Sequence, residues 1–284
     1  MTIVEGCLLS RRDDLTIIEF FLFIGVGCGV GFLAGLFGVG GGFVMVPVLI
    51  FSYEHLGFSP SVLTHIAIGT SLFVVLFSSL SSSYQQKKQN NIDWRSVFVI
   101  GLSSVLTALA TSRLAASLSG KHLKIAFAVI VIIAAVRMLT ESQTKAAEKL
   151  EFTSRPSMMG LITVGLTAGI VSALAGIGGG VFTIPMMYYF LNIPIKLAIG
   201  TSSAAIFITA FFSAIGYIIN GIGRPGLPEW NLGFVDLQRG VALAIGTFLL
   251  GRVGAYVSFK THPFRLRKLF ALFVILIAVY ILVK

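Results

Sequence analysis

A glycine-rich stretch that occurs twice inside long apolar segments is the feature that most restricts the fold of this chain. The sequence GVGGGFVMVP runs from Gly38 to Pro47, and GIGGGVFTIP runs from Gly176 to Pro185. Both copies lie in runs apolar enough to cross a bilayer, where non-helical backbone must be buried in protein or line a polar cavity. A matched pair of such interruptions, one in each half, is typical of the substrate site of a membrane transporter. We therefore expect a carrier whose site lies between the two stretches.

The composition of the 284-residue chain predicts a multi-pass protein of the cell membrane, in contact with the lipid bilayer. Hydrophobic residues make up 56% of the sequence and charged residues 11%, and the mean hydropathy is +0.95. The net charge of +10 comes from lysines and arginines scattered among loops, which suits lipid headgroups and argues against a nucleic-acid partner. Two cysteines indicate neither a disulfide framework nor a metal site, and no motif resembles a catalytic set. We expect no enzyme activity and no cofactor.

The two halves of the chain match in register, which predicts an internal duplication. With a constant shift of 138 positions, seven of the eighteen residues from Gly31 to Val48 are identical in the second half. The seven residues from His65 and from Lys196 share five identities, and the ten residues from Phe127 and from Phe270 share six. We expect an N-terminal transmembrane repeat over residues 1–140, a linker over 141–157 and a C-terminal transmembrane repeat over 158–284.

Two arrangements of the repeats remain open. If each glycine-rich segment crosses the membrane once, each repeat has four transmembrane segments and the repeats are parallel. If each is a full span followed by a short returning half-helix, each repeat has five segments and the repeats are inverted. An apolar helix of about eleven residues after the glycines rises only about 16 Å, too little to span a bilayer alone, so we favour the inverted arrangement. The predicted fold class is an all-α integral membrane protein of two homologous repeats, with four to five transmembrane segments each and a broken first helix in each repeat.

The glycines of both stretches are candidate substrate-binding positions. Glycine permits positive φ angles and lets a ligand approach the backbone closely, and a helix that starts after them presents free N–H groups and its positive dipole end. Two such helix starts would form an anion site without a fixed charge. Close helix packing is the alternative role for glycine in a membrane protein, but the matched pair favours a site. The candidates are Gly40, Gly41, Gly42, Gly178, Gly179 and Gly180.

Hydroxyl side chains in the segments that follow the glycine stretches are further candidates. Thr70, Ser71, Thr201 and Ser202 occupy matching positions in the two halves. Their hydroxyls can donate hydrogen bonds to substrate oxygens, or they can bond back to a carbonyl one turn earlier, as is common in membrane helices.

Two basic residues, His65 and Lys196, lie one turn before these hydroxyls. They could draw anions toward the site from opposite faces, although a basic residue that reaches the interface from a helix end is the slightly favoured explanation. His65 is also the candidate proton carrier if transport is proton-coupled. Because Glu19, Asp93 and Asp236 all lie near segment ends, we do not expect a buried-carboxylate proton relay.

These motifs resemble those of the sulfite exporter TauE/SafE family of membrane permeases. The resemblance rests on the paired glycine stretches, on the AIGTS elements that begin at Ala67 and Ala198, and on the basic-then-apolar closing spans at Lys124 and Arg267. It implies export of small sulfur-containing anions such as sulfite or organosulfonates, bound at the glycines, Thr70, Ser71, Thr201 and Ser202. An anion channel, or a carrier of small carboxylates or amino acids on the same scaffold, is the alternative.

Overall fold

The computed structural model describes residues 16–123, 125, 129 and 156–261, and within them the fold is almost entirely helical. The third matching segment, the predicted linker over 141–157 and the predicted closing spans lie largely or wholly outside these residues. Eight helices are described: α2 (Ile17–Phe37), α3 (Gly42–His55), α4 (Pro60–Lys88), α5 (Trp94–Ser117), α7 (Met158–Ala175), α8 (Gly180–Phe190), α9 (Ile195–Gly221) and α10 (Leu237–Lys260).

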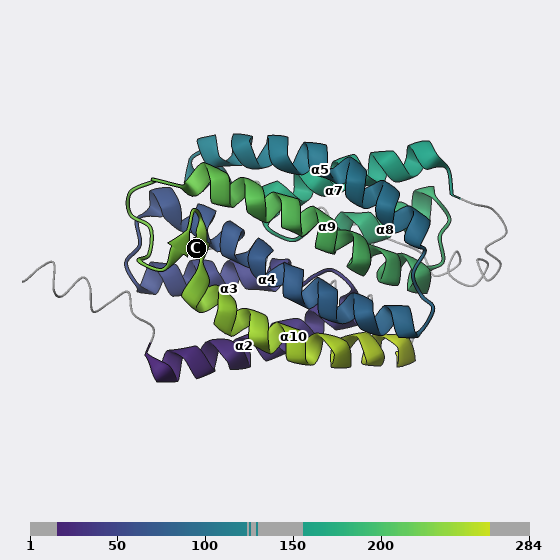
Figure 1. Cartoon of the computed structure of the whole chain (residues 1–284), viewed down its shortest axis with the longest axis horizontal. Coiled ribbons are helices and arrows are strands. Elements are labelled where there is room, and N and C mark those ends of the chain that lie inside the picture. The colour runs from purple at the N-terminus through teal and green to yellow at the C-terminus, as the bar shows by residue number, and fades with distance from the viewer. Residues whose placement is uncertain (1–15, 124, 126–128, 130–155, 262–284) are drawn as a thin grey trace, which may run out of the picture.

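Six of the helices are long and apolar enough to cross a membrane, namely α2, α4, α5, α7, α9 and α10. Figure 1 shows them side by side along the longest axis of the molecule, with α4 and α9 between the pair α2 and α10 and the pair α5 and α7. The outward stripe of α5 is formed by Phe98, Leu102, Leu106 and Leu109, which are exposed and spaced by three or four residues, as a lipid-facing helix surface requires. The chain is therefore a multi-pass membrane protein, as its composition predicted.

Two helices are too short to span a bilayer. Helix α3 has 14 residues and α8 has 11, so that they rise only about 21 Å and about 16 Å. The chain passes from α2 to α3 through Gly38–Gly41, here called the first glycine loop, and from α7 to α8 through Gly176–Gly179, the second glycine loop.

The hydrogen bonds near the helix starts establish the directions of the central helices. Thr70, near the start of α4, accepts a bond from the backbone N–H of Asp236 at the start of α10. Thr201, near the start of α9, accepts one from Asp93 at the start of α5. Because α5 follows directly where α4 ends, α4 and α9 run antiparallel. We call the end where α4 and α10 begin the first end of the bundle, and the end where α5 and α9 begin the second end.

Glycines allow α2 to lie against α10 and α7 against α5 at very short distances. A Cβ atom on Gly31 would lie 2.4 Å from the Cα of Thr247, and one on Gly35 would lie 2.0 Å from the carbonyl oxygen of Gly251. On the other side of the bundle, a Cβ on Gly169 would lie 2.4 Å from the carbonyl oxygen of Ser104. Backbones approach this closely only where one residue has no side chain, which is the usual basis of helix packing in membranes.

One element was not predicted from the sequence. A two-stranded antiparallel ribbon, β1 (Asn231–Leu232) and β2 (Val235–Asp236), precedes α10 at the first end. Its turn carries Phe234, which is buried and donates a backbone hydrogen bond to the carbonyl of Tyr217 in α9. The ribbon therefore folds inward against α9, and it brings the start of α10 into the protein interior.

Candidate functional site

The two glycine loops have nearly the same backbone conformation. Gly41 and Gly179 cap the starts of α3 and α8 with φ angles of 80° and 85°, in the left-handed region. A residue with a Cβ atom is disfavoured there by about 1–2 kcal/mol, whereas glycine adopts this region freely. The glycines thus end one helix and start the next within four residues.

The structure brings the two glycine loops into direct contact. A Cβ atom on Gly42 would lie 2.2 Å from the carbonyl oxygen of Gly176, and one on Gly180 would lie 2.9 Å from the Cα of Val39. Val75 of α4 and Ile206 of α9 flank both loops, since each lies near Gly40 and Gly178. The glycines predicted from the sequence therefore meet at one place, and a ligand between the loops requires them to move apart.

Of the predicted hydroxyls, Ser71 contacts the loops directly. Its Oγ donates to the carbonyl of Gly176 at 2.8 Å. Ser78, which the sequence analysis did not select, donates to the carbonyl of Gly40 at 2.7 Å. The sequence did contain a signal for Ser78: the shift of 131 positions that relates His65 to Lys196 also relates Ser78 to another hydroxyl residue, Thr209. Ser202 of α9 is fully buried, and within the described part of the chain its Oγ has no hydrogen-bond partner, so that this hydroxyl can bind an added acceptor or donor.

Thr70 and Thr201 do not face the glycine loops. Their hydroxyl oxygens accept the backbone N–H groups of Asp236 and Asp93, at 2.9 Å and 3.0 Å, where α10 and α5 begin. Each threonine therefore joins α4 or α9 to the start of a helix that lies more than one hundred positions away in the sequence. Because their hydroxyl groups are used in this way, they act in the packing of the bundle rather than at the loop contact.

His65 and Lys196 lie at opposite ends of the bundle, in different environments. His65 is 3% exposed, its ring stacks on Phe234 at 5.2 Å, and its Nε2 lies 3.1 Å from the carbonyl oxygen of Ala115. The favoured expectation that it reaches the membrane interface is wrong, because the inward-folded ribbon covers it. Lys196 is exposed at the second end, with its Nζ 4.9 Å from the ring centroid of Phe259.

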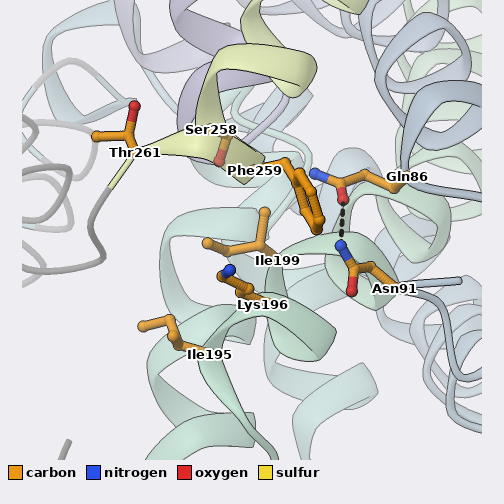
Figure 2. A pocket seen from close by; sticks show the side chains of 8 residues that line it. All are labelled: Gln86, Asn91, Ile195, Lys196, Ile199, Ser258, Phe259 and Thr261. Atoms are coloured by element: carbon orange, nitrogen blue, oxygen red, sulfur yellow. Dashed lines mark hydrogen bonds between the residues drawn. The ribbon is translucent and has the colours of Figure 1, made fainter. Parts of the chain in front are cut away.

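A pocket opens beside Lys196 at the second end. Figure 2 shows its lining side chains, among which Gln86 and Asn91 are joined by a hydrogen bond of 3.4 Å. Ile199 lines the inner side of the pocket and also contacts the first glycine loop, since a Cβ on Gly38 would lie 2.5 Å from its Cγ2. The pocket is lined by Gln86, Asn91, Ile195, Lys196, Ile199, Ser258, Phe259 and Thr261.

A buried charged cluster lies at the start of α10, where the sequence suggested only a segment end. Asp236 is 0% exposed and Arg239 is 2% exposed, and Nη1 of Arg239 donates to the carboxylate at 2.7 Å. Tyr53 of α3 donates to the same carboxylate at 3.1 Å. Because Asp236 lies near the end of an apolar run, we predicted no buried carboxylate there, and that prediction is wrong.

Comparison with known proteins gives a consistent result. A family described as "Sulfite exporter TauE/SafE" matches residues 23–281. A "Probable membrane transporter protein" of Haemophilus influenzae is 32% identical over 263 residues, which cover 91% of this chain and 96% of that protein. A second, from Methanocaldococcus jannaschii, is 31% identical over 248 residues, covering 87% and 89% of the two chains. No solved structure matches the chain.

Proposed function

The chain belongs to the sulfite exporter TauE/SafE family of membrane proteins, and from that premise we propose that it exports small sulfur-containing anions such as sulfite or organosulfonates. The resemblance inferred from its motifs is confirmed, and the chain is a membrane transporter rather than an enzyme. The substrate class rests on one observation above all: two helix starts meet through glycine loops in the centre of the bundle. The first N–H groups of such helices lack partners within the helix and favour an anion.

The matched contacts of the two halves support an inverted repeat. Shifts of 138, 131 and 143 positions relate α2 to α7, α4 to α9 and α5 to α10. Under these shifts, the approach of Gly27 to Leu243 corresponds to that of Gly165 to Ile100. The bond from Asp236 to Thr70 likewise corresponds to the bond from Asp93 to Thr201. Since equivalent helices α4 and α9 run antiparallel, the axis that relates the halves lies in the membrane plane.

Single cysteines in the connecting loops test this topology. After Cys7 and Cys28 are changed to serine, we expect Gly57→Cys and Asn192→Cys to react with a membrane-impermeant maleimide from opposite sides of the membrane. Both positions are exposed, and they follow α3 and α8, which are equivalent in the proposed repeats. Labelling of both positions from the same side would instead require parallel repeats.

Alternating access is supported by the contrast between the two ends of the bundle. At the first end, His65, Phe234 and Tyr217 pack together, with the two aromatic rings 6.3 Å apart. The equivalent residues at the second end are Lys196, Asn91 and Gln86, and they line the pocket of Figure 2. We propose that this structure represents a state in which the first end is closed. If the first end opens and the second end packs together in its place, the central site becomes exposed to the opposite side of the membrane.

Counterflow of labelled sulfite into proteoliposomes tests the proposed function. We expect saturable uptake that requires unlabelled sulfite inside and that external organosulfonates inhibit, because both compounds present sulfur-bound oxygens to the same N–H groups. Empty liposomes and the Gly29→Leu variant, altered on the lipid side of α2, are the controls. Exchange of carboxylates without sulfite uptake would overturn the substrate class, and ion conductance without counterflow would make the protein an anion channel.

A further inference from the structure

We propose that Asp236 and Arg239 couple transport to protons, because the substrate anion and the ionised carboxylate of Asp236 compete for the guanidinium of Arg239. This inference rests on the proposed function and assigns its coupling residues. It replaces His65 as the candidate proton carrier, since the ring of His65 is covered by Phe234.

The carboxylate of Asp236 is held by groups from two helices, α10 and α3. It accepts from Nη1 of Arg239 at 2.7 Å, from the hydroxyl of Tyr53 at 3.1 Å and from the backbone N–H of Arg239 at 3.2 Å. The backbone N–H of Asp236 itself is bound by Thr70 of α4 at 2.9 Å. Tyr53 also lies within 3.4 Å of the Thr70 hydroxyl, and the guanidinium of Arg239 lies 5.7 Å from the centroid of the Tyr53 ring.

The guanidinium of Arg239 retains binding capacity for an anion. Its Nε is buried and has no hydrogen-bond partner among the described residues, although a guanidinium has five N–H donors and remains charged. A buried donor without a partner costs free energy until it finds an acceptor. Nε is therefore an unfilled position beside an ion pair. One oxygen of a sulfur oxyanion could bind there and a second at Nη2, which lies on the same side of the guanidinium and gives the two-point geometry that Arg favours.

The cluster is close to the glycine loops along α4. Thr70, which binds the start of α10, is followed directly by Ser71, whose hydroxyl binds the second glycine loop at Gly176. Movement of that loop, which anion entry requires, therefore acts on the helix segment that holds Asp236 in place.

Among the described residues, the equivalent position at the second end of the bundle lacks this charged arrangement. The equivalent of Asp236 is Asp93, which caps α5 and is bound by Ser96 where Arg239 would stand. The equivalent of Tyr53 is Leu191. In both halves the capping aspartate accepts a backbone N–H of the first helical turn without help from another charged residue. Stability of the helix start therefore does not explain why Arg239 and Tyr53 lie beside Asp236. A buried ion pair costs desolvation energy, and ionisable residues inside membrane proteins usually mark transport pathways.

The charges determine the expected stoichiometry. While Asp236 is ionised, it neutralises Arg239 and leaves no net charge for a substrate anion. When the carboxylate takes up one proton from water on the side to which the site is open, Arg239 can bind one monovalent anion. Among the described residues, Tyr53 of α3 contacts the carboxylate itself, and His65 of α4 and Tyr217 of α9 pack against Phe234, two positions before Asp236. Arg224 adds a positive charge that acts on His65. On release at the other side, the anion and the proton leave together, so that transport of a monovalent anion is electroneutral.

Ethanesulfonate is a suitable probe, because a sulfonate keeps its single negative charge from about pH 5.5 to about pH 8 and only protein groups titrate. In proteoliposomes with wild-type protein, we expect an inward proton gradient to accelerate its uptake on the order of 10-fold per pH unit, the largest change in protonated fraction that one unit allows. A membrane potential is expected to have no effect. If uptake is fast and saturable but its rate depends on the membrane potential and not on the proton gradient, the inference is overturned while the carrier function remains intact. Absence of any sulfonate or sulfite counterflow would overturn the proposed function itself.

Two substitutions then locate the coupling. We expect Asp236→Asn, which imitates the protonated carboxylate, to make uptake independent of the proton gradient and sensitive to the potential. The matched control Asp93→Asn, at the equivalent position without an arginine, is expected to keep proton-driven uptake. If Asp236→Asn reduces the yield of folded protein, Arg239→Gln combined with Asp236→Asn gives a neutral cluster, which is expected to insert but to lose saturable uptake. Proton-driven uptake in either Asp236 variant would contradict the proposal.

Discussion

Leucine at both Gly41 and Gly179 is expected to abolish sulfite counterflow while the protein still inserts into the membrane. Both glycines have φ angles of 80° or more, which a leucine adopts at a cost of about 1–2 kcal/mol each. Their added Cβ atoms would also lie 2.8 Å from the Cβ of Ala34 and 2.6 Å from the carbonyl oxygen of Ala168. The helix starts would therefore move, and the N–H groups that we propose to hold the anion would lose their positions.

The measurement is initial uptake at several sulfite concentrations, with the amount of inserted protein determined in the same vesicles. We expect uptake of the double variant to fall below about one tenth of the wild-type rate, as for lost preorganised anion contacts worth about 1.4 kcal/mol or more. Gly25→Leu and Gly29→Leu are matched controls, because a Cβ at either position meets no atom of the described residues within 4 Å. Normal uptake by the double variant would exclude the glycine loops as the binding site.

Leucine at Gly35 is expected to have the largest effect on stability. Its Cβ would lie 2.0 Å from the carbonyl oxygen of Gly251 and 2.7 Å from the backbone nitrogen of Ala255. Both atoms belong to the backbone of α10 and cannot move aside as a flexible side chain would. The two helices would have to separate, and we expect a loss of about 3 kcal/mol, the upper part of the range for overpacked sites.

Thermal unfolding of the detergent-solubilised protein, followed by tryptophan fluorescence and by size-exclusion chromatography, measures this loss. Gly29→Leu on the same helix is the control, and it is expected to unfold at the wild-type temperature because position 29 faces outward. If Gly35→Leu were as stable as this control, α2 and α10 could not be in the close contact described above.

The loop conformation and the membrane character could be predicted from the sequence because both depend on local properties. Hydropathy alone predicts which runs cross a bilayer, and closely spaced glycines before a proline predict where a helix ends and another begins. The positive φ angles at Gly41 and Gly179 follow the same local logic. The contact between the two loops was also predicted, because a matched pair of glycine-rich interruptions is typical of a single shared site.

The placement of Asp236 depended on contacts that no local pattern reveals. Its position at the start of an apolar run suggested a segment end at the membrane surface. In the structure, the ribbon over Asn231–Asp236 folds inward, and Phe234 lies between the first turns of α4 and the last turns of α9. The start of α10 is therefore inside the protein, and a carboxylate placed there is compensated by Arg239 and Tyr53.

The hydroxyls illustrate the same division between local and tertiary information. The repeated AIGTS elements marked Thr70, Ser71, Thr201 and Ser202 as a group, but the two residues of each element lie in different surroundings. Ser71 binds the second glycine loop, whereas Thr70 binds a backbone N–H 166 positions away. Adjacent residues of a helix point about 100° apart, so that the sequence selected the right turn of α4 and only the packing of neighbouring helices decided which hydroxyl faces the loops.

The sequence by itself therefore determined the membrane class, the family and the glycine loops, since hydrophobicity, glycine-rich interruptions and matching motifs depend only on the order of the residues. Only the tertiary structure decided which polar groups are buried and with what partners. The reason is physical: the cost of burying a charge depends on compensating groups in space, and for Asp236 the partner Tyr53 lies 183 positions away along the chain.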